Sequence, residues 1–341
     1  MKIIAKLNKI ALLAIIAVAT FSCNNDDPIV NPTPVDNSIA GIASRDANLS
    51  TLVQALTKTG LVSTVSASGS LTVFAPTNTA FSAFLTANGF ANLDAVPVAV
   101  LKEILSNHVV QGAKPSTALV DQSYIKTLAK GSASTSNTLS MFVDKTNGVK
   151  LNGVSTVTTA NILATNGVIH VVNAVIGLPT IVTHAAANPA FKILVKVVTS
   201  TVANGNGFGD QSAIATALTT NTTPLTVFAP TDAAFTSATT GTGFAVGASP
   251  ATVTKVLQYH VVAGNNLAAS LVDNTDITTV ANVPASTTTF QQLKVFTLGA
   301  LGPRLQDKAT APNNISKIIA TDVQCTNGVI HAIDKVLQPN L

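Results

Sequence analysis

The chain has 341 residues, of which only 10% are charged, and its formal net charge is +4. It contains no Trp, two Tyr and no basic cluster, so its composition argues against nucleic-acid binding. Mean hydropathy is +0.43, yet no stretch after the N-terminal leader approaches the ~18 apolar residues of a membrane helix. We therefore expect large cores rich in Ala and Val rather than membrane spans.

The N-terminus has the pattern of a bacterial lipoprotein signal peptide. Three lysines precede an apolar run at 10–21, which is too short for a stable membrane span. Ser22 then precedes Cys23, and a small residue before a lone cysteine resembles a lipobox, in which the cysteine is lipidated and becomes the mature N-terminus. We predict a signal peptide over 1–23 with lipid on Cys23; the alternative is an ordinary signal peptide that ends beside a cysteine.

The next segment, 24–37, is polar, Pro-rich and without apolar periodicity. Such a composition is typical of a flexible tether. Asp26 and Asp27, close behind the cysteine, resemble the surface-export signals of Bacteroidetes lipoproteins. The resemblance implies a lipid anchor in the outer membrane with the chain exposed outside, and a periplasm-facing orientation is the alternative.

Three sequence blocks occur twice, in the same order. LTVFAPTNTAF at 71–81 returns as LTVFAPTDAAF, NHVVQG at 107–112 returns as YHVVAG, and TNGVIH at 165–170 returns unchanged. The spacing between copies matches a duplicated domain, whose usual size is about 100–150 residues. We predict a first copy over 38–180 and a second over 181–341.

Each copy is predicted to begin with an amphipathic helix, over Arg45–Leu56 and Asn188–Val198. Both segments place apolar residues at i, i+3, i+4 and i+7, which is a helical period. Thr77 and Thr231 are placed to cap a later helix, and Asp232 in its first turn suits the helix dipole.

The LTVFAP block is predicted to be a buried strand. Phe74 and Phe228 supply the aromatic core positions, and Pro76 and Pro230 end the strand. Burial of both rings is therefore expected.

A central helix in each copy is predicted to end at a histidine. His108 and His260 each lie seven residues after the start of an apolar helical stripe, and a Val-Val strand follows. In the TNGVIH block, His170 and His331 alternate onto one face of a predicted strand. The Asn-Gly pair before that strand is typical of a hairpin turn.

Together these blocks resemble the fasciclin-type domain, and the resemblance covers about residues 38–341. It implies an α+β fold in which each tandem domain is a twisted β-sandwich wedge with several helices packed along one side. It also implies adhesion and contact with extracellular matrix. The first copy departs from the family pattern: Asn107 replaces the phenol of Tyr259, and Asn173 replaces the carboxylate of Asp334.

Neither a catalytic site nor a metal or cofactor site is expected on the shared histidines. No HxH or HxxxH spacing occurs, and buried imidazoles bonded to the backbone explain the pattern better. Asp322 and Asp334 bracket His331, so a hydrolytic triad can be drawn, but no GxSxG nucleophile motif accompanies it. Cys325 is predicted to be a packed, small apolar residue, and Asn204–Gly209 a surface loop rather than a phosphate-binding loop.

The sequence therefore predicts a non-enzymatic surface lipoprotein for adhesion or interaction. Its partners are expected to be the membrane through the N-terminal lipid, and a protein or glycan surface on the matrix or on other cells. The alternative is a lipoprotein that binds a glycan or small ligand during nutrient capture; the 4% aromatic content weakens it. We expect the binding surface in the segments that differ most between the copies, 111–160 and 263–318.

Overall fold

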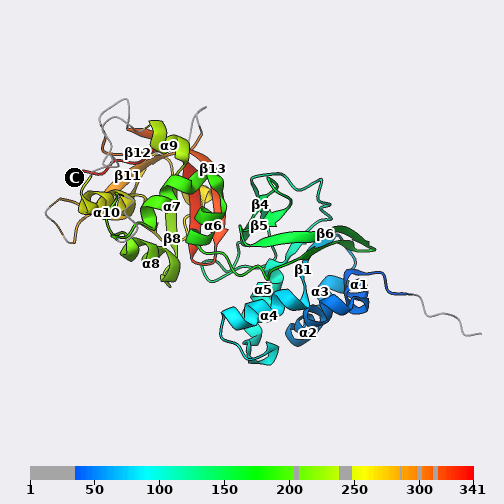
Figure 1. The fold of residues 1–341 in the computed structure, drawn as a ribbon. Helices are drawn as coiled ribbons and strands as arrows, with labels where there is room; N and C mark the ends of the chain where they lie inside the picture. Colours follow the sequence, from blue (N-terminus) through cyan, green and yellow to red (C-terminus); the bar gives the residue numbers. More distant parts are fainter. Residues whose placement is uncertain are drawn as a thin grey trace, which may run out of the picture. The chain divides into compact units, whose positions relative to one another are not determined.

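The computed structural model describes residues 35–202, 207–237, 248–284, 286, 288–297, 302–309 and 314–341, and Asp36–Leu341 form one unit (Figure 1). The predicted signal peptide, Cys23 and most of the predicted tether lie outside the described residues. So does much of the predicted loop at Asn204–Gly209, of which Gly207, Phe208 and Gly209 are described.

The helical start of each copy is broken where a single helix was predicted. The first copy has α1 (Ile39–Arg45), η1 (Ala47–Leu49), α2 (Ser50–Thr59) and α3 (Val62–Ser66). The second has α6 (Ile181–Ala187), η3 (Pro189–Phe191), α7 (Lys192–Val198) and α8 (Ser212–Thr220). Asp46 and Asn188 cause the breaks, because each is extended and its side chain accepts an N–H two residues later, from Asn48 or Ala190. The predicted helix over Arg45–Leu56 was therefore wrong in its bounds.

The LTVFAP blocks form the expected buried strands. β1 (Leu71–Pro76) and β8 (Leu225–Pro230) are buried at every position. Thr77 caps α4 (Asn78–Ala87) by accepting the Ala80 N–H, as predicted. Thr231 precedes α9 (Asp232–Ser237) and accepts the Ala234 N–H at 3.4 Å.

The central helices also lie where the periodicity places them. They are α5 (Val98–Asn107) and α10 (Pro250–Tyr259), and the next residue, His108 or His260, is the C-cap. β2 (Val109–Gln111) and β9 (Val261–Ala263) follow at once. Short turns η2 (Leu93–Ala95) and η4 (Ala268–Ser270) complete the helical elements described.

In the part of the chain that the structure describes, each copy has one seven-stranded sheet, and its remaining strands follow β2 or β9. In the first copy they are β3 (Ser123–Lys126), β4 (Ser140–Asp144), β5 (Lys150–Leu151), β6 (Ser155–Ala164) and β7 (Gly167–Val172). In the second they are β10 (Thr275–Asn282), β11 (Phe290–Phe296), β12 (Arg304–Gln306), β13 (Ile315–Cys325) and β14 (Gly328–Ile333).

The strand order is the same in both copies. It is β2-β1-β7-β6-β5-β4-β3 in the first, and the second closes as a barrel, β10-β11-β12-β13-β14-β8-β9. In the first, a bridge between Val110 and Thr127 links the two ends of the sheet. The two layers expected of a sandwich are thus parts of one curled sheet.

The Asn-Gly pairs do not form the predicted turns. Gly167 and Gly328 are the first residues of β7 and β14, and the two-residue loops lie one position earlier, at Thr165-Asn166 and Thr326-Asn327. Gly is required because φ is +150° and +154°, and a Cβ would overlap the carbonyl oxygen of Leu71 or Leu225 on the neighbouring parallel strand. The glycine serves close strand approach rather than the turn.

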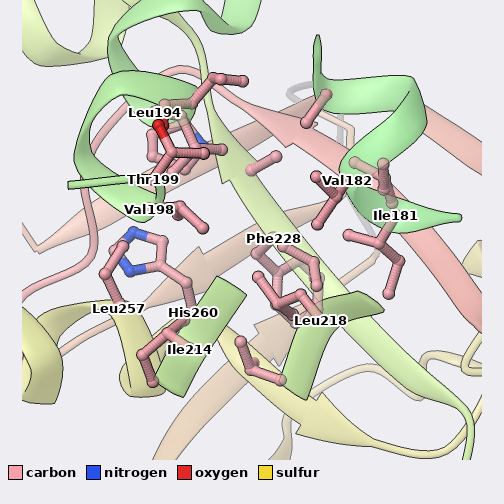
Figure 2. A pocket seen from close by; sticks show the side chains of 17 residues that line it. Ile181, Val182, Leu194, Val198, Thr199, Ile214, Leu218, Phe228, Leu257 and His260 are labelled. Carbon is pink, nitrogen blue, oxygen red and sulfur yellow. The ribbon is translucent and has the colours of Figure 1, made fainter. Parts of the chain in front are cut away.

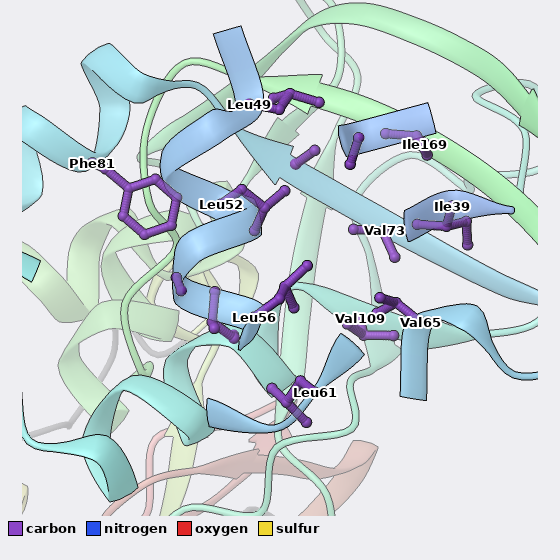
Figure 3. Close-up of a cluster of buried hydrophobic side chains, with 14 of the residues drawn as sticks. Ile39, Leu49, Leu52, Leu56, Leu61, Val65, Val73, Phe81, Val109 and Ile169 are labelled. Carbon is purple, nitrogen blue, oxygen red and sulfur yellow. The ribbon is translucent and has the colours of Figure 1, made fainter. Parts of the chain in front are cut away.

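The helices cover one face of each sheet and bury a core there. In the first copy this core joins α1, α2 and α3 to β1 and β7 through Ile39, Leu52, Val65, Val73 and Ile169 (Figure 3). A second cluster on the opposite face gathers around Phe74, and the second copy has its own pair of clusters. The fold is the predicted α+β class, two tandem domains of seven strands with helices along one side.

Because the main clusters are separate, we expect each copy to fold alone. Fragments 36–180 and 181–341 should each give native circular dichroism and a cooperative melting transition. Tyr124 is the one residue of the first copy that the described clusters place against the core of the second. Two unfolded fragments would contradict the predicted boundary.

Among the described residues, no single helix combines the length and apolar character needed to cross a bilayer. Ile181–Ala187 and Pro189–Val198 reach that length only together, as a pair bent by 100°.

Candidate functional site

The first pair of shared histidines, His108 and His260, links the segment after the last strand of each copy to its central helix. Each Nδ1 lies 2.7–2.8 Å from the carbonyl oxygen four residues earlier, and each Nε2 accepts a 2.9 Å bond from a backbone N–H. Because Nε2 is the acceptor, Nδ1 carries the proton. The partners are Ile104 O and Ile176 N–H for His108, and Val256 O and Leu337 N–H for His260.

The second pair, His170 and His331, uses the opposite tautomer. Each Nε2 donates to a carbonyl oxygen of the loop after β2 or β9, at 2.9 Å and 2.8 Å, and each Nδ1 accepts an N–H at 3.3 Å. The N–H belongs to a residue with positive φ in a strand bulge, Asn161 or Asp322. The rings stack on Phe74 and Phe228, with centroids 5.4 Å and 5.6 Å apart.

All four of these imidazoles are buried and favoured in the neutral form. Burial lowers the pKa of His108 and of His260 to about 4, and it lowers the pKa of His170 and of His331. Both nitrogens of every ring already have backbone partners. Metal binding or proton transfer would have to break those bonds, so the arrangement suits a structural role.

Removing one of these rings should destabilise its domain. We expect His260→Ala to lower the free energy of unfolding by about 3 kcal/mol, since Leu337 N–H and Val256 O lose their buried partner. His260→Asn should cost less, because its amide can replace the Nδ1 donor. Urea unfolding measures both, and an unchanged midpoint for the alanine variant would contradict the structural role.

Of the two substitutions between the copies, one keeps the hydrogen bond of the original residue and the other does not. Asp334 accepts the Lys317 N–H at 2.7 Å, and Asn173 accepts the Thr156 N–H at 2.8 Å in the same way. The amide oxygen of Asn173 therefore accepts the same kind of backbone hydrogen bond as the carboxylate of Asp334. Tyr259 has no such substitute: its hydroxyl donates to Gln292 O at 2.9 Å.

Asn107, which replaces Tyr259 in the first copy, donates instead to Gly177 O at 3.0 Å. The last residue of the central helix therefore bonds the segment after β7 in the first copy and strand β11 in the second.

Sequence reasoning missed the role of Asn166 and Asn327. Each side-chain oxygen accepts the N–H of the first residue of α1 or α6, and each amide donates to the carbonyl of a residue in α3 or α8. The identical TNGVIH blocks carried the signal, but an Asn before Gly favoured a turn.

The hydrolytic triad that the sequence allows around His331 is not assembled in the structure. His331 Nδ1 faces the backbone N–H of Asp322, not its carboxylate, while Asp334 bonds Lys317 and Ser316. The described residues hold no group of three or more His, Cys, Asp or Glu that could bind a metal ion.

Cys325 is completely buried in the apolar cluster of the second copy. Its Sγ lies 3.4 Å from Val323 O, and burial raises the pKa of the thiol. A raised pKa suppresses the reactive thiolate, as the prediction of a packed residue requires.

A small apolar cavity lies between the helices and sheet of the second copy (Figure 2). Its volume is about 40 Å³, and Leu194, Val198, Phe228, Leu257 and His260 are among its walls. A space of this size and polarity suits neither a sugar nor a cofactor. It is a packing gap rather than a site.

Filling the gap should stabilise the second copy. The first copy has Leu56 at the position of Val198, counted from the equivalent caps Asp46 and Asn188. Val198→Leu adds one methylene, so we expect a gain of about 1 kcal/mol in the free energy of unfolding. A lower melting temperature would show that the gap cannot take the larger side chain.

Comparison with known proteins agrees with this architecture. The Fasciclin domain family matches residues 47–179 and 200–339. Protein sll1483 of Synechocystis sp. is 36% identical over 163 residues, 47% of this chain and 86% of that protein. Uncharacterized protein sll1735 of the same organism is 34% identical over 139 residues, 41% of this chain and 96% of that protein.

A solved FAS1 domain pair from the insect cell adhesion molecule Fasciclin I is 17% identical with a TM-score of 0.46, covering 85% of this chain and 96% of that one. Fasciclin domains are generally linked to cell adhesion or surface interaction, and the family is non-enzymatic. With the family matched over most of its length in two segments, this chain belongs to the fasciclin domain family.

Proposed function

We propose that this chain is a lipid-anchored, non-enzymatic surface protein that attaches to extracellular matrix, other cells or surface partners through its two fasciclin domains. The observation that carries the proposal is that the histidines of the shared blocks make hydrogen bonds that hold the fold together. All four shared histidines bond backbone groups of their own copy. The shared residues therefore account for the architecture, and binding is left to surfaces that differ between the copies.

The anchor depends on Cys23 and the polar segment after it. More than one acyl chain holds a protein firmly to a bilayer, so extraction should need detergent. Cys23→Ser should release the protein or leave it unprocessed. Mass spectrometry of the mature N-terminus decides this, and an unmodified terminus elsewhere would refute the anchor.

The differing segments present separate apolar side chains at the surface. In 111–160, Val120 is 66% exposed and Val154 57%; in 263–318, Val272 is 61% exposed. A partner that covers such side chains would gain burial energy, about 25 cal/mol per Å² of apolar surface.

The test is attachment of beads coated with residues 36–341 to matrix and to cells. Val120→Asp, Val154→Asp and Val272→Asp should weaken attachment. Val98→Asp is the matched control, since Val98 is 49% exposed but lies on the central helix. Attachment that survives the three variants and fails in the control would overturn this assignment of the surface.

One observation favours the glycan-binding alternative. A groove of about 550 Å³ runs between α10 and the end of β10, with Lys255, Gln258 and Asn282 among its lining residues. Asn282 Oδ1 is buried there without a hydrogen-bond partner among the described residues, and could accept from a sugar hydroxyl. Phe290 pairs with Asn282 in the ladder and is 43% exposed, as a stacking platform needs.

A glycan array separates the two functions. Retention of a glycan by the wild type and its loss in Gln258→Ala would favour this alternative. No retained glycan, together with attachment to protein-coated surfaces, would favour adhesion to protein.

A further inference from the structure

The two domains contact each other through hydrogen bonds and packed side chains, and we call this contact the joint. It is formed by β3, β4 and the loop between them in the first domain, and by the end of β13 with α6 in the second. Hydrogen bonds of 2.7–3.1 Å cross it, among them Lys126 Nζ to Asp322 O, Ser132 Oγ to Thr326 O, Ala133 N–H to Thr326 O, Gln324 N–H to Ser140 Oγ, and Asn188 Nδ2 to the Tyr124 hydroxyl.

Two residues of the joint, Lys126 and Gln324, differ between the copies. Thr127 and Thr279 make equivalent bonds in the two copies, which aligns Lys126 with Thr278. The paired strands likewise align Gln324 with Leu163. Gln324 is fully buried, whereas Leu163 is 74% exposed. At these two positions the copies differ where one domain contacts the other.

His184 lies in the joint and is the one histidine outside the repeated blocks. It belongs to α6, is fully buried, and packs edge-on against Tyr124 with ring centroids 5.4 Å apart. The backbones of Ser140 and Gln324 approach its ring. Neither ring nitrogen, however, has a partner in hydrogen-bond geometry within the described chain.

Among the described residues, the charged and titratable groups around His184 include no carboxylate paired with its ring. From β3, Lys126 contributes an ammonium, and Tyr124 a hydroxyl that accepts from Asn188 Nδ2. From β13, Cys325 contributes a buried thiol, and the Asp322 carboxylate accepts the Ala268 N–H of its own domain. A proton on His184 would place a buried cation near the exposed Lys126 ammonium.

We propose that the joint closes only around neutral His184, so that mild acid separates the two fasciclin domains while each stays folded. Opening lets water solvate the buried His184 ring and moves it away from the Lys126 ammonium, and it breaks the bonds of the joint. Of the residues in the two main core clusters, it withdraws only Tyr124 from the core of the second domain. Burial lowers the pKa of His184 to about 3, in the direction that this coupling requires. One proton shifts the equilibrium at most tenfold per pH unit, or about 30-fold between pH 6.5 and 5.

The chain supplies its own reporter, because it has no Trp and its two tyrosines are Tyr124 and Tyr259. In a Tyr259→Phe background, fluorescence quenching by acrylamide reports Tyr124 alone. Between pH 7 and 5 we expect Tyr124 to become accessible while far-ultraviolet circular dichroism stays constant. His184→Phe keeps the ring contact and removes the titration, so Tyr124 should stay protected.

Small-angle scattering of the unsubstituted chain gives a second readout. The radius of gyration should rise over the same pH range. Protection of Tyr124 down to the pH at which circular dichroism collapses would overturn the proposal. Equal opening of His184→Phe and its parent would also overturn it, as would an unchanged radius of gyration.

Discussion

Acid should destabilise each domain well before its carboxylates are protonated. His108 and His260 have an unfolded pKa near 6.5 and a folded pKa of about 4. A depressed folded pKa means that stability is full above pH 6.5 and falls as the unfolded chain takes up the proton first. Each ring should cost about 2 kcal/mol at pH 5 and about 3 kcal/mol at pH 4. Urea unfolding of each domain over pH 7 to 4 measures the loss.

A non-titrating variant separates this effect from general acid damage. His260→Asn should begin less stable at pH 7 but lose less on acidification, so its pH profile should be flatter in the second domain. His108 is unchanged in that variant, so the first domain should keep the parent profile. Equal slopes for parent and variant in the second domain would refute the linkage to His260.

The repeated blocks were predictable because local pattern and tertiary packing agree there. An apolar stripe that ends at His260 predicts a helix whose last turn faces the core, and the ring lies there as a C-cap. LTVFAP likewise predicts a strand because it is rich in β-branched and aromatic residues, and every residue of β1 is buried in the structure. Its Phe74 could be assigned to the core without knowing that His170 stacks on it.

Other features depend on contacts that sequence spacing does not encode. Asp46 breaks the first helix through a single side-chain bond, although the apolar period runs on past it. The joint was also unpredictable, because Lys126 and Asp322 are far apart in sequence and the bond reaches a backbone oxygen. The segment 111–160 was expected to bind external partners, but part of it faces the second domain.

The second large effect concerns a methyl group at Gly167. Gly167→Ala places a Cβ against the Leu71 carbonyl oxygen, at a φ of +150° that L side chains rarely adopt. The parallel pairing of β1 with β7 can only relieve the overlap by separating, and Asn166 beside it ties α1 to α3. We expect a loss on the order of 4 kcal/mol or more in the first domain. The melting temperature and urea midpoint of that domain measure it.

Gly177→Ala is the matched control in the same domain. No atom lies within 4 Å of a Cβ built there, and its φ is not positive, so the change should stay within about 0.5 kcal/mol. Gly328→Ala should repeat the Gly167 result in the second domain, where the Leu225 carbonyl oxygen occupies the space. If Gly167→Ala and Gly177→Ala destabilise equally, close strand approach is not the reason for glycine in this block. If only Gly167→Ala and Gly328→Ala are severe, the Asn-Gly pair recurs because the asparagine joins helices and the glycine lets two parallel strands meet.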